Sequence, residues 1–154
     1  SREQVQAHGR RMQQAHGNDH YAARLVAETA LLDQRRAVVD GMRNLDELRH
    51  LRRAAGARRR RLVLLALVLD AERRFARVRG RGRAGDPAAF EAFRGDDARA
   101  NAGPGGFQDN RALIAAADLV IENGGDEAAL RRAVTEAVTR MQHGDAGPAW
   151  NAGS

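Results

Sequence analysis

The stretch LVLLALVLD, residues 62–70, decides the fold that this sequence predicts. Residues 62–69 are apolar at every position, which is typical of a strand covered on both faces in a parallel sheet. The length of the run and its polar flanks favour a strand over a buried helical segment. We therefore expect a central strand here, and Asp70 can cap the helix that follows it.

Helical and extended segments alternate on both sides of this strand. We expect a helix that Asp19 caps and that buries Tyr21, Leu25, Val26, Thr29 and Leu32, and a last helix that buries Leu130, Val134, Val138 and Met141. In chain order, the expected elements are helices over 2–16 and 20–36, a strand at 37–39, a helix over 45–54 capped by Asn44 with Glu47, the strand at 62–69, helices over 71–79 and 87–94, a helix over 110–117 capped by Asp109, a strand at 119–121 and the last helix.

This alternation predicts right-handed crossovers and a parallel sheet. The expected fold class is α/β, a three-layer parallel sheet with flanking helices. One domain would span residues 1–142, and residues 143–154 would form a flexible C-terminal tail. Residues 95–108 are expected to be mobile.

The composition restricts the chemistry of the chain. Only 4% of the 154 residues are aromatic, and all 26 basic residues are arginine. The net charge of +6 indicates either an anionic partner or a genome rich in arginine codons, and both readings stay open. The lack of cysteine excludes disulfides and thiolate metal sites, and the two serines, both terminal, exclude a serine hydrolase. With no apolar run long enough to cross a bilayer and no signal peptide at the N-terminus, we expect a cytoplasmic protein with no membrane partner.

The segment AVVDGMRNLDEL, residues 37–48, holds the first candidate site. In open α/β sheets ligands bind at the carboxyl ends of the strands, where Asp40 would lie. Its carboxylate could bind Mg²⁺, Gly41 allows a sharp turn beside a ligand, and the fork of Arg43 suits phosphate oxygens. The alternative is that Asp40 caps a turn and Arg43 pairs with an acid at the start of the next helix.

Three segments resemble P-loop nucleotide kinases. VVDGMRNLDELRHLR resembles their Asp-Gly-x-Arg segment before a Glu-bearing helix, and LALVLDAERRFARVRGRGRAGDPAAFEAFRGDDARA resembles their fourth strand, arginine-bearing helix and lid. DNRALIAAADLVIENGGDEAALRRAV resembles their closing segment. The closest similarity is to dephospho-CoA-kinase-like and adenylate-kinase-like proteins, among them proteins described as AAA-family ATPases, and it covers roughly residues 2–142.

The resemblance implies ATP-dependent phosphoryl transfer to a nucleotide or to a dephospho-CoA-like molecule, with ATP and Mg²⁺ as cofactors. In phosphoryl transfer, a protein mainly positions the reactants and stabilises the charge on the transferred phosphoryl group, and arginines can do both. The implied lid arginines are Arg73, which would contact the substrate, and Arg77 and Arg81, which would act in catalysis. Asp40 would lie at the metal and act in catalysis, Gly41 and Arg43 would lie at the substrate, and Asn123 and Gly124 would lie near the adenine. Each of these implied roles has a purely structural alternative. The lid arginines could form a solvated helix face, and Asn123 could belong to an ordinary strand-to-helix turn.

One motif of these kinases is missing. They hold ATP phosphates with Gly-x-x-x-x-Gly-Lys-Ser/Thr, but this chain has no lysine, and its cluster GPGGF at residues 103–107 does not follow a strand. We expect either that the central first strand and its phosphate loop are lacking or that the chain is a degenerate relative. In both cases we expect doubtful ATP binding, no unaided phosphoryl transfer, and self-association through exposed strand edges.

Two other functions remain open from the sequence. One is a nucleic-acid-binding module, which no helix-turn-helix spacing supports and for which stacking aromatics are nearly absent. The other is a regulatory pseudo-enzyme. The arginines of the nucleic-acid alternative are Arg49, Arg52, Arg53 and Arg58 to Arg61.

Overall fold

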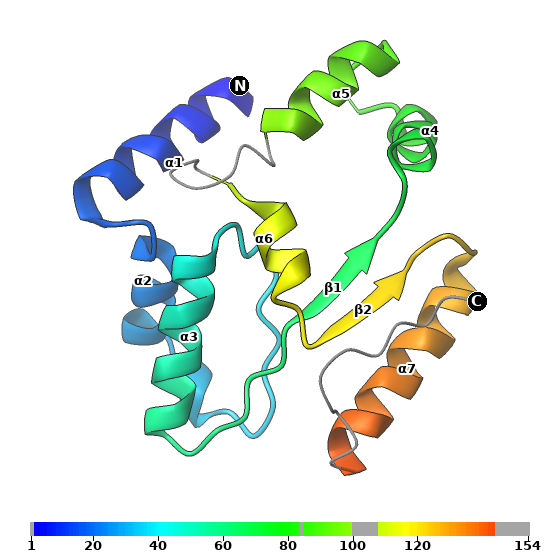
Figure 1. Cartoon of the computed structure of the whole chain (residues 1–154). Coiled ribbons are helices and arrows are strands. Elements are labelled where there is room, and N and C mark those ends of the chain that lie inside the picture. Colours follow the sequence, from blue (N-terminus) through cyan, green and yellow to red (C-terminus); the bar gives the residue numbers. More distant parts are fainter. Residues whose placement is uncertain (1, 84, 100–107, 144–154) are drawn as a thin grey trace. The chain divides into compact units, whose positions relative to one another are not determined.

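The structure is a computed structural model that describes residues 2–83, 85–99 and 108–143. The chain forms two compact units. One unit comprises Ser1–Leu62 with Ala98–Leu113, and the other comprises Val63–Asp97 with Ile114–Ser154. Figure 1 shows the elements of each unit, which are described separately below.

The first unit is helical in its described residues. It contains α1 (Arg2–His16), α2 (His20–Glu28), a 3-10 turn at Leu31–Asp33 and α3 (Leu45–Ala57). Helices α2 and α3 lie side by side in Figure 1. Leu48, only 1% exposed, and Leu51 lie one turn apart on the face of α3 that is buried, and α2 contributes Ala22.

Helix α3 begins as the sequence predicts. The side-chain oxygen of Asn44 accepts hydrogen bonds from the backbone N–H groups of Asp46 and Glu47, at 2.9 and 3.0 Å. These are amides that have no partner inside the helix. Glu47 reaches back and accepts from the N–H of Arg43 at 2.7 Å, so the reciprocal cap predicted from Asn44 and Glu47 forms.

Helix α3 ends in an arrangement that usually contains glycine. The N–H of Arg60 donates to the carbonyl of Ala55 at 2.8 Å, and that of Arg59 donates to the carbonyl of Gly56 at 2.9 Å. This pair of bonds is the Schellman motif, whose penultimate residue adopts the left-handed conformation. Arg59 occupies that position with φ +54°, where a side chain is sterically disfavoured.

The second unit is built on two parallel strands, β1 (Leu65–Val68) and β2 (Leu119–Glu122). Their register pairs Leu65 with Leu119 and Val68 with Glu122. Helix α7 (Glu127–His143) lies along β2 (Figure 1). The core cluster of this unit consists of Leu119, Ile121 and Ala137, each 3% exposed, with Val63, Leu65, Leu130, Ala133, Val134 and Met141 packed against it.

The remaining helices are α4 (Ala71–Arg81), α5 (Phe90–Arg99) and α6 (Asn110–Ala115). Asp70 caps α4 as predicted, because its carboxylate accepts from the N–H of Arg73 at 2.8 Å. Asp109 caps α6 in the same way, through the N–H of Ala112 at 3.0 Å. None of the helices in the described part of the chain has the length and apolar character needed to span a membrane.

The strand predicted at residues 37–39 is wrong. This segment is coil, with Val38 95% exposed and Val39 38% exposed. A strand needs a neighbour for its backbone N–H and C=O groups, and among the described residues this unit offers none. Of the three strands that the sequence predicts, the two others form and pair in parallel.

The helix expected over residues 20–36 ends at Glu28, since Thr29 is extended and its hydroxyl bonds the carbonyl of Leu25. The side chain of Asp19 does not cap α2. Leu25, Val26 and Leu32, which were expected to be buried, are partly exposed, and the buried residue of α2 is Ala22. Val138, expected to be buried, is 37% exposed.

Other boundaries also differ from the prediction. Strand β1 is shorter than the predicted run at 62–69, and α3, α4, α5 and α6 end at other residues than expected. Helix α5 also begins at Phe90 and not at Pro87. Residues 95–99, expected to be mobile, belong to α5. The rest of that segment from 100 to 107, with the GPGGF cluster, and the expected tail from residue 144 on lie outside the described residues.

We predict that Arg59→Gly raises the free energy of unfolding by about 0.5–1 kcal/mol, since glycine adopts the left-handed conformation without steric cost. Urea unfolding measures the change. Arg59→Ala is the matched control, because it removes the guanidinium but keeps a β-carbon; it should change stability by less than about 0.5 kcal/mol. Equal gains from both variants would show that the side chain, and not the backbone, causes the strain.

Candidate functional site

The carboxyl ends of β1 and β2 form one edge of the second unit. There the N–H of Asn123 donates to the carbonyl of Val68 at 2.8 Å, so the two chain segments leave the sheet together. A hollow of about 270 Å³ lies beside this edge. Small-molecule sites in parallel sheets lie at this edge. The hollow is lined by Leu67, Val68, Leu69, Arg74, Arg77, Val78, Phe93 and Asn123.

Two arginines of α4 reach the turn that follows β2. Arg77 donates through Nη2 to the carbonyls of Asn123 and Gly125, at 2.8 and 2.9 Å. The guanidinium of Arg73 lies so close to Gly124 that a β-carbon at that position would be 2.8 Å from Nη1. The structure therefore brings together four residues that the sequence assigned to the lid and to the adenine, namely Arg73, Arg77, Asn123 and Gly124.

Arg73 and Arg77 differ in their contacts. The Arg73 side chain is 61% exposed, and its ion pair with the cap residue Asp70 is long, at 3.5 Å. A surface pair of this kind contributes little to stability, so Arg73 can turn to an anionic ligand at small cost. Arg77 holds the turn by two charge-assisted bonds, which fixes its guanidinium at the edge of the sheet.

Arg74 is a residue that the sequence did not single out. Its Nε donates to the carbonyl of Leu69 at 2.9 Å, its guanidinium lies over the Phe93 ring, and it forms a bidentate pair with Asp97 of α5, with Nη2 at 2.9 Å. This pair lowers the pKa of Asp97 and raises that of Arg74. Arg74 thus fastens both the end of β1 and α5 to α4.

Aromatic rings gather beside Arg74. Phe75 of α4 contacts Phe90 and Phe93 of α5, with ring centroids 5.4 and 5.6 Å apart. The Arg79 guanidinium lies 6.0 Å from the centre of the Phe75 ring. These contacts form an apolar wall that continues to the hollow through Phe93.

Arg81, the third predicted lid arginine, is engaged elsewhere. It lies in the last turn of α4 and forms a bidentate pair with Asp86, at 2.8 and 2.9 Å. The structure does not bring its guanidinium to Asn123 or Gly124, in contrast to Arg77. A role for Arg81 at a ligand would require it to leave Asp86.

The other predicted site residues, Asp40, Gly41 and Arg43, belong to the first unit. Asp40 is exposed on coil, and Gly41 has φ +89°, a conformation that requires glycine here. Arg43 is exposed; its carbonyl accepts from the N–H of Asp109 at 2.8 Å, and its own N–H caps α3 through Glu47.

Asp40 is the carboxylate that the sequence assigned to Mg²⁺. No group of three His, Cys, Asp or Glu side chains suited to a metal occurs in the part of the chain that the structure describes. Because Mg²⁺ is commonly held by one or two carboxylates together with ligand phosphates and water, Asp40 suits it only when a phosphorylated ligand supplies further oxygens.

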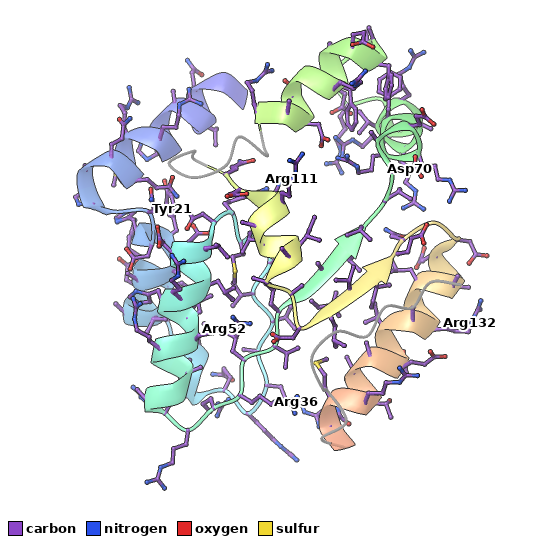
Figure 2. The ribbon with its side chains drawn as sticks, viewed as in Figure 1. Tyr21, Arg36, Arg52, Asp70, Arg111 and Arg132 are labelled. Atoms are coloured by element: carbon purple, nitrogen blue, oxygen red, sulfur yellow. The ribbon has the colours of Figure 1, made fainter. Side chains whose placement is uncertain are left out.

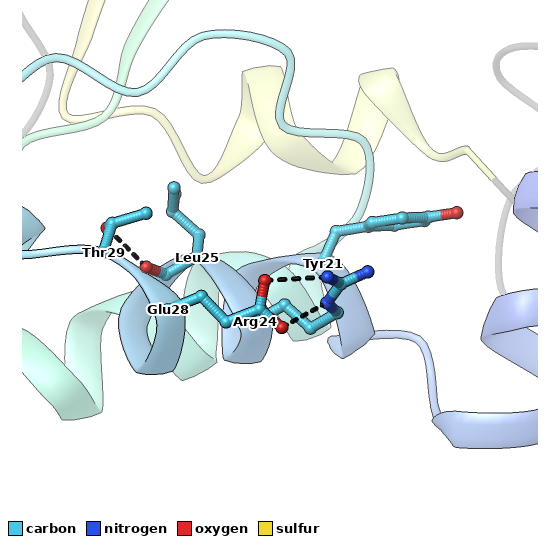
Figure 3. A pocket seen from close by; sticks show the side chains of 5 residues that line it. All are labelled: Tyr21, Arg24, Leu25, Glu28 and Thr29. Carbon is cyan, nitrogen blue, oxygen red and sulfur yellow. Dashed lines mark hydrogen bonds and ion pairs between the residues drawn. The ribbon is translucent and has the colours of Figure 1, made fainter.

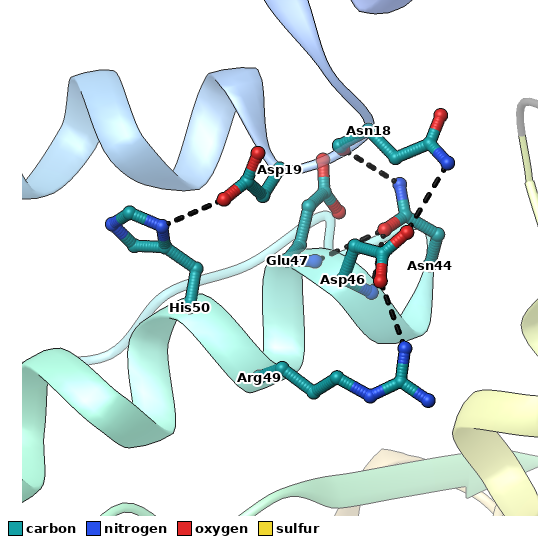
Figure 4. Close-up of polar contacts among 7 residues, drawn as sticks. All are labelled: Asn18, Asp19, Asn44, Asp46, Glu47, Arg49 and His50. Carbon is teal, nitrogen blue, oxygen red and sulfur yellow. Dashed lines mark hydrogen bonds and ion pairs between the residues drawn. The ribbon is translucent and has the colours of Figure 1, made fainter.

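A network of polar side chains joins the turn before α2 to α3, as Figure 4 shows. Asn44 donates to the carbonyl of Asn18 at 3.1 Å, and Asn18 donates to the carboxylate of Asp46 at 3.1 Å. His50 lies 2.8 Å from the carboxylate of Asp19. Burial raises the pKa of Glu47, which is 5% exposed. These contacts join the turn before α2 to α3.

A second hollow of about 250 Å³ lies on α2 (Figure 3). Arg24 crosses it and makes two 2.7 Å contacts with Glu28, one turn further along the same helix. The hollow is open to solvent on one helix face, and its two charges neutralise each other. We assign no ligand to it. Its lining residues are Tyr21, Arg24, Leu25, Glu28 and Thr29.

The sequence is similar to that of a UPF0200 protein from Hyperthermus butylicus, with 35% identity over 88 residues. The matched stretch is 57% of this chain and 45% of the relative, so the chain spans less than half the length of the curated relative that it matches. The name of that protein describes no activity and no ligand. No protein-family model matches the chain, and no solved structure matches it.

We predict that Asp97→Asn lowers the free energy of unfolding at neutral pH by about 1–2 kcal/mol, because it removes a partly buried, charge-assisted pair. The pKa of Asp97 is lowered in the folded state, so the unfolded chain binds its proton more tightly. The stabilisation is therefore present above the ordinary aspartate pKa and is lost as the pH falls through the lowered value.

Urea unfolding between about pH 3 and pH 7 measures this effect, which should be smaller in Asp97→Asn than in the parent chain. Arg74→Gln should flatten the same part of the pH profile, and the double variant should add little to either single change. Strictly additive losses would contradict the pairing.

Proposed function

We propose that the chain is a kinase-like phosphotransferase domain that binds a nucleotide or dephospho-CoA-like molecule at the carboxyl edge of β1 and β2. The observation that carries this proposal is the convergence of Arg73 and Arg77 on the turn at residues 123–125, next to the hollow. Phosphate groups carry the negative charge that these guanidinium groups match, and Phe93 contributes apolar lining to the hollow. The order of the three kinase-like sequence segments supports the same reading.

Each residue would have a simple task in this function. Arg73, whose side chain is exposed, would bind phosphate oxygens by turning away from Asp70. Arg77 would keep the turn at residues 123–125 in shape and add positive charge. The turn itself would lie near the adenine, and Arg81 would join only if its pair with Asp86 opened.

Asp40, Gly41 and Arg43, all in the first unit, are proposed separately as residues that bind an acceptor molecule. A carboxylate at Asp40 could bind Mg²⁺ together with ligand phosphates, Gly41 supplies the turn, and the exposed Arg43 side chain could contact an acceptor phosphate. These roles come from the resemblance to P-loop nucleotide kinases and from the residue types.

The chain would not transfer phosphate from ATP unaided. No lysine is present anywhere in the 154 residues, and the hollow of about 270 Å³ is slightly smaller than the usual 300–1,000 Å³ of a small-molecule site. A nucleotide there would remain partly exposed. Self-association through strand edges remains a prediction.

We predict that Arg73→Ala weakens the binding of nucleoside monophosphates, dephospho-CoA or Mg²⁺-ATP by about tenfold or more, the loss expected for one charge-assisted hydrogen bond. Isothermal titration calorimetry measures the change. Arg132→Ala is the matched control: Arg132 is exposed on α7, away from the turn at residues 123–125 (Figure 2), so its loss should leave binding unchanged.

Equal losses from Arg73→Ala and Arg132→Ala would show that net charge, and not this edge of the sheet, attracts the ligand. Binding of none of the three ligands to the parent chain would contradict the proposal. We expect no ATP-dependent phosphoryl transfer by the chain alone. If the chain does catalyse this transfer and Asp40→Ala abolishes it, that expectation is wrong.

A further inference from the structure

Positive charge is concentrated in two segments of the first unit. Residues 34–39 and 48–61 together contain nine arginines and no aspartate or glutamate. The whole chain has a net charge of +6, so the remainder of the sequence is net negative. A further run of six arginines without an acid, residues 73–83, belongs to the second unit.

The structure joins these two segments. Arg58 donates to the carboxylate of Asp33 at 2.7 Å, which ties the end of α3 to the chain immediately before Arg35 and Arg36. The Schellman motif then turns the chain at Arg59 and Arg60. Figure 2 shows Arg36 on the loop and Arg52 on α3. The loop that carries Arg35 and Arg36 and the end of α3 are therefore neighbours, and we call the arginines of residues 34–39 and 48–61 the basic surface.

Most of the basic surface is available to a partner. In the part of the chain that the structure describes, five of its arginine side chains form no ion pair with an acid. Asp33 is already paired with Arg58, and Asp46 with Arg49. Of these five side chains only Arg60 is partly buried. The five residues are Arg35, Arg36, Arg53, Arg59 and Arg60.

Arg59 adds an independent observation. It keeps a charged side chain at φ +54°, where glycine would avoid a cost of about 1–2 kcal/mol. Backbone strain of this kind gathers at functional sites, and the inference runs from the observed strain to a role. A guanidinium held at this position despite the strain fits a surface whose task is to carry charge.

We propose that the basic surface binds the phosphate backbone of double-stranded nucleic acid without reading its sequence. Arginine forks match phosphate oxygens, and successive phosphates along a duplex suit a row of guanidinium groups. The two segments contain no Phe, Tyr or Trp, so they lack the stacking platforms that single-stranded nucleic acid needs. This site uses other residues than the carboxyl edge of the sheet and does not depend on the function proposed for that edge.

The structure does not favour a lipid surface as the partner. A helix that lies on a membrane inserts a row of large apolar side chains beside its basic residues. After its first residue, α3 has two large apolar side chains, Leu48 and Leu51. They are 1% and 3% exposed, so they are not available for insertion into a membrane. Val38 and Val39 are exposed, but they are two side chains on a loop and do not form an apolar helix face.

We predict that the chain binds a fluorescein-labelled 20-base-pair duplex of arbitrary sequence, measured by fluorescence anisotropy between about 50 and 200 mM NaCl. Five unpaired arginines give a slope of log K against log salt of about −4.5. The variant R35Q/R36Q/R53Q/R59Q should make this slope shallower by about 3.6, because each of its four substitutions leaves one phosphate without a neutralising arginine and changes the slope by about 0.9. At 50 mM salt we expect its affinity to fall about a hundredfold or more.

The matched control is R10Q/R11Q/R111Q/R132Q, which changes four exposed arginines outside the basic surface. Both variants lose four positive charges, so the formal net charge of +6 becomes +2 in each. The control should keep most of the slope. R35K/R36K/R53K/R59K, which preserves the charges, should keep binding and reports whether the substituted positions tolerate change. A circular dichroism spectrum of each variant verifies folding.

Equal losses in the two glutamine variants would overturn the proposal, since they would show that net charge alone attracts the duplex. Tighter binding to phosphatidylserine vesicles than to the duplex at the same salt would also overturn it. A single-stranded 20-mer that binds more tightly than the duplex would contradict the assignment of the partner.

Discussion

The short parallel ladder between β1 and β2 is the constraint on which the second unit depends. At its start, the N–H of Leu64 donates to the Asp118 carboxylate at 2.7 Å, and the N–H of Asp118 donates to the carbonyl of Leu64 at 2.9 Å. At its end, Asn123 bonds Val68. Because both ends of the ladder are held, the register cannot slip by a residue without breaking these polar contacts.

This register places the arginines of α4. The chain leaves β1 at Val68, and Asp70 caps α4 immediately afterwards, so the first turns of the helix lie beside the end of β2. Arg74 and Arg77 then meet the carbonyls of Leu69 and of the turn after β2. An edge lined by arginines thus results from backbone geometry that four-residue strands are sufficient to specify.

The sequence predicted the local features better than the tertiary ones. Asn44, Asp70 and Asp109 cap their helices as expected, since capping depends on residues that lie within a few positions of each other. Residues 37–39 have a strand-like composition but no partner, and pairing cannot be read from three residues. Arg74 was missed because its partner Asp97 lies 23 positions away and no local pattern links them.

At the candidate sites, too, local features were predicted and tertiary contacts were not. The spacing of Arg73 and Arg77 on one helix face and the turn at Asn123 and Gly124 were recognisable from sequence, but not their contact with each other. Arg59 carried no signal, because left-handed helix ends are usually marked by glycine and this one is not.

The ion pair between Asp33 and Arg58 has a consequence for the entropy of association. A basic tail that binds a polyanion must lose the conformational freedom of its backbone when the complex forms. Here the loop that carries Arg35 and Arg36 is already tied to the end of α3 by Asp33. Part of the backbone ordering of these arginines therefore takes place during folding, and a polyanion that bound them would cost the loop less backbone freedom than it would cost an untied tail.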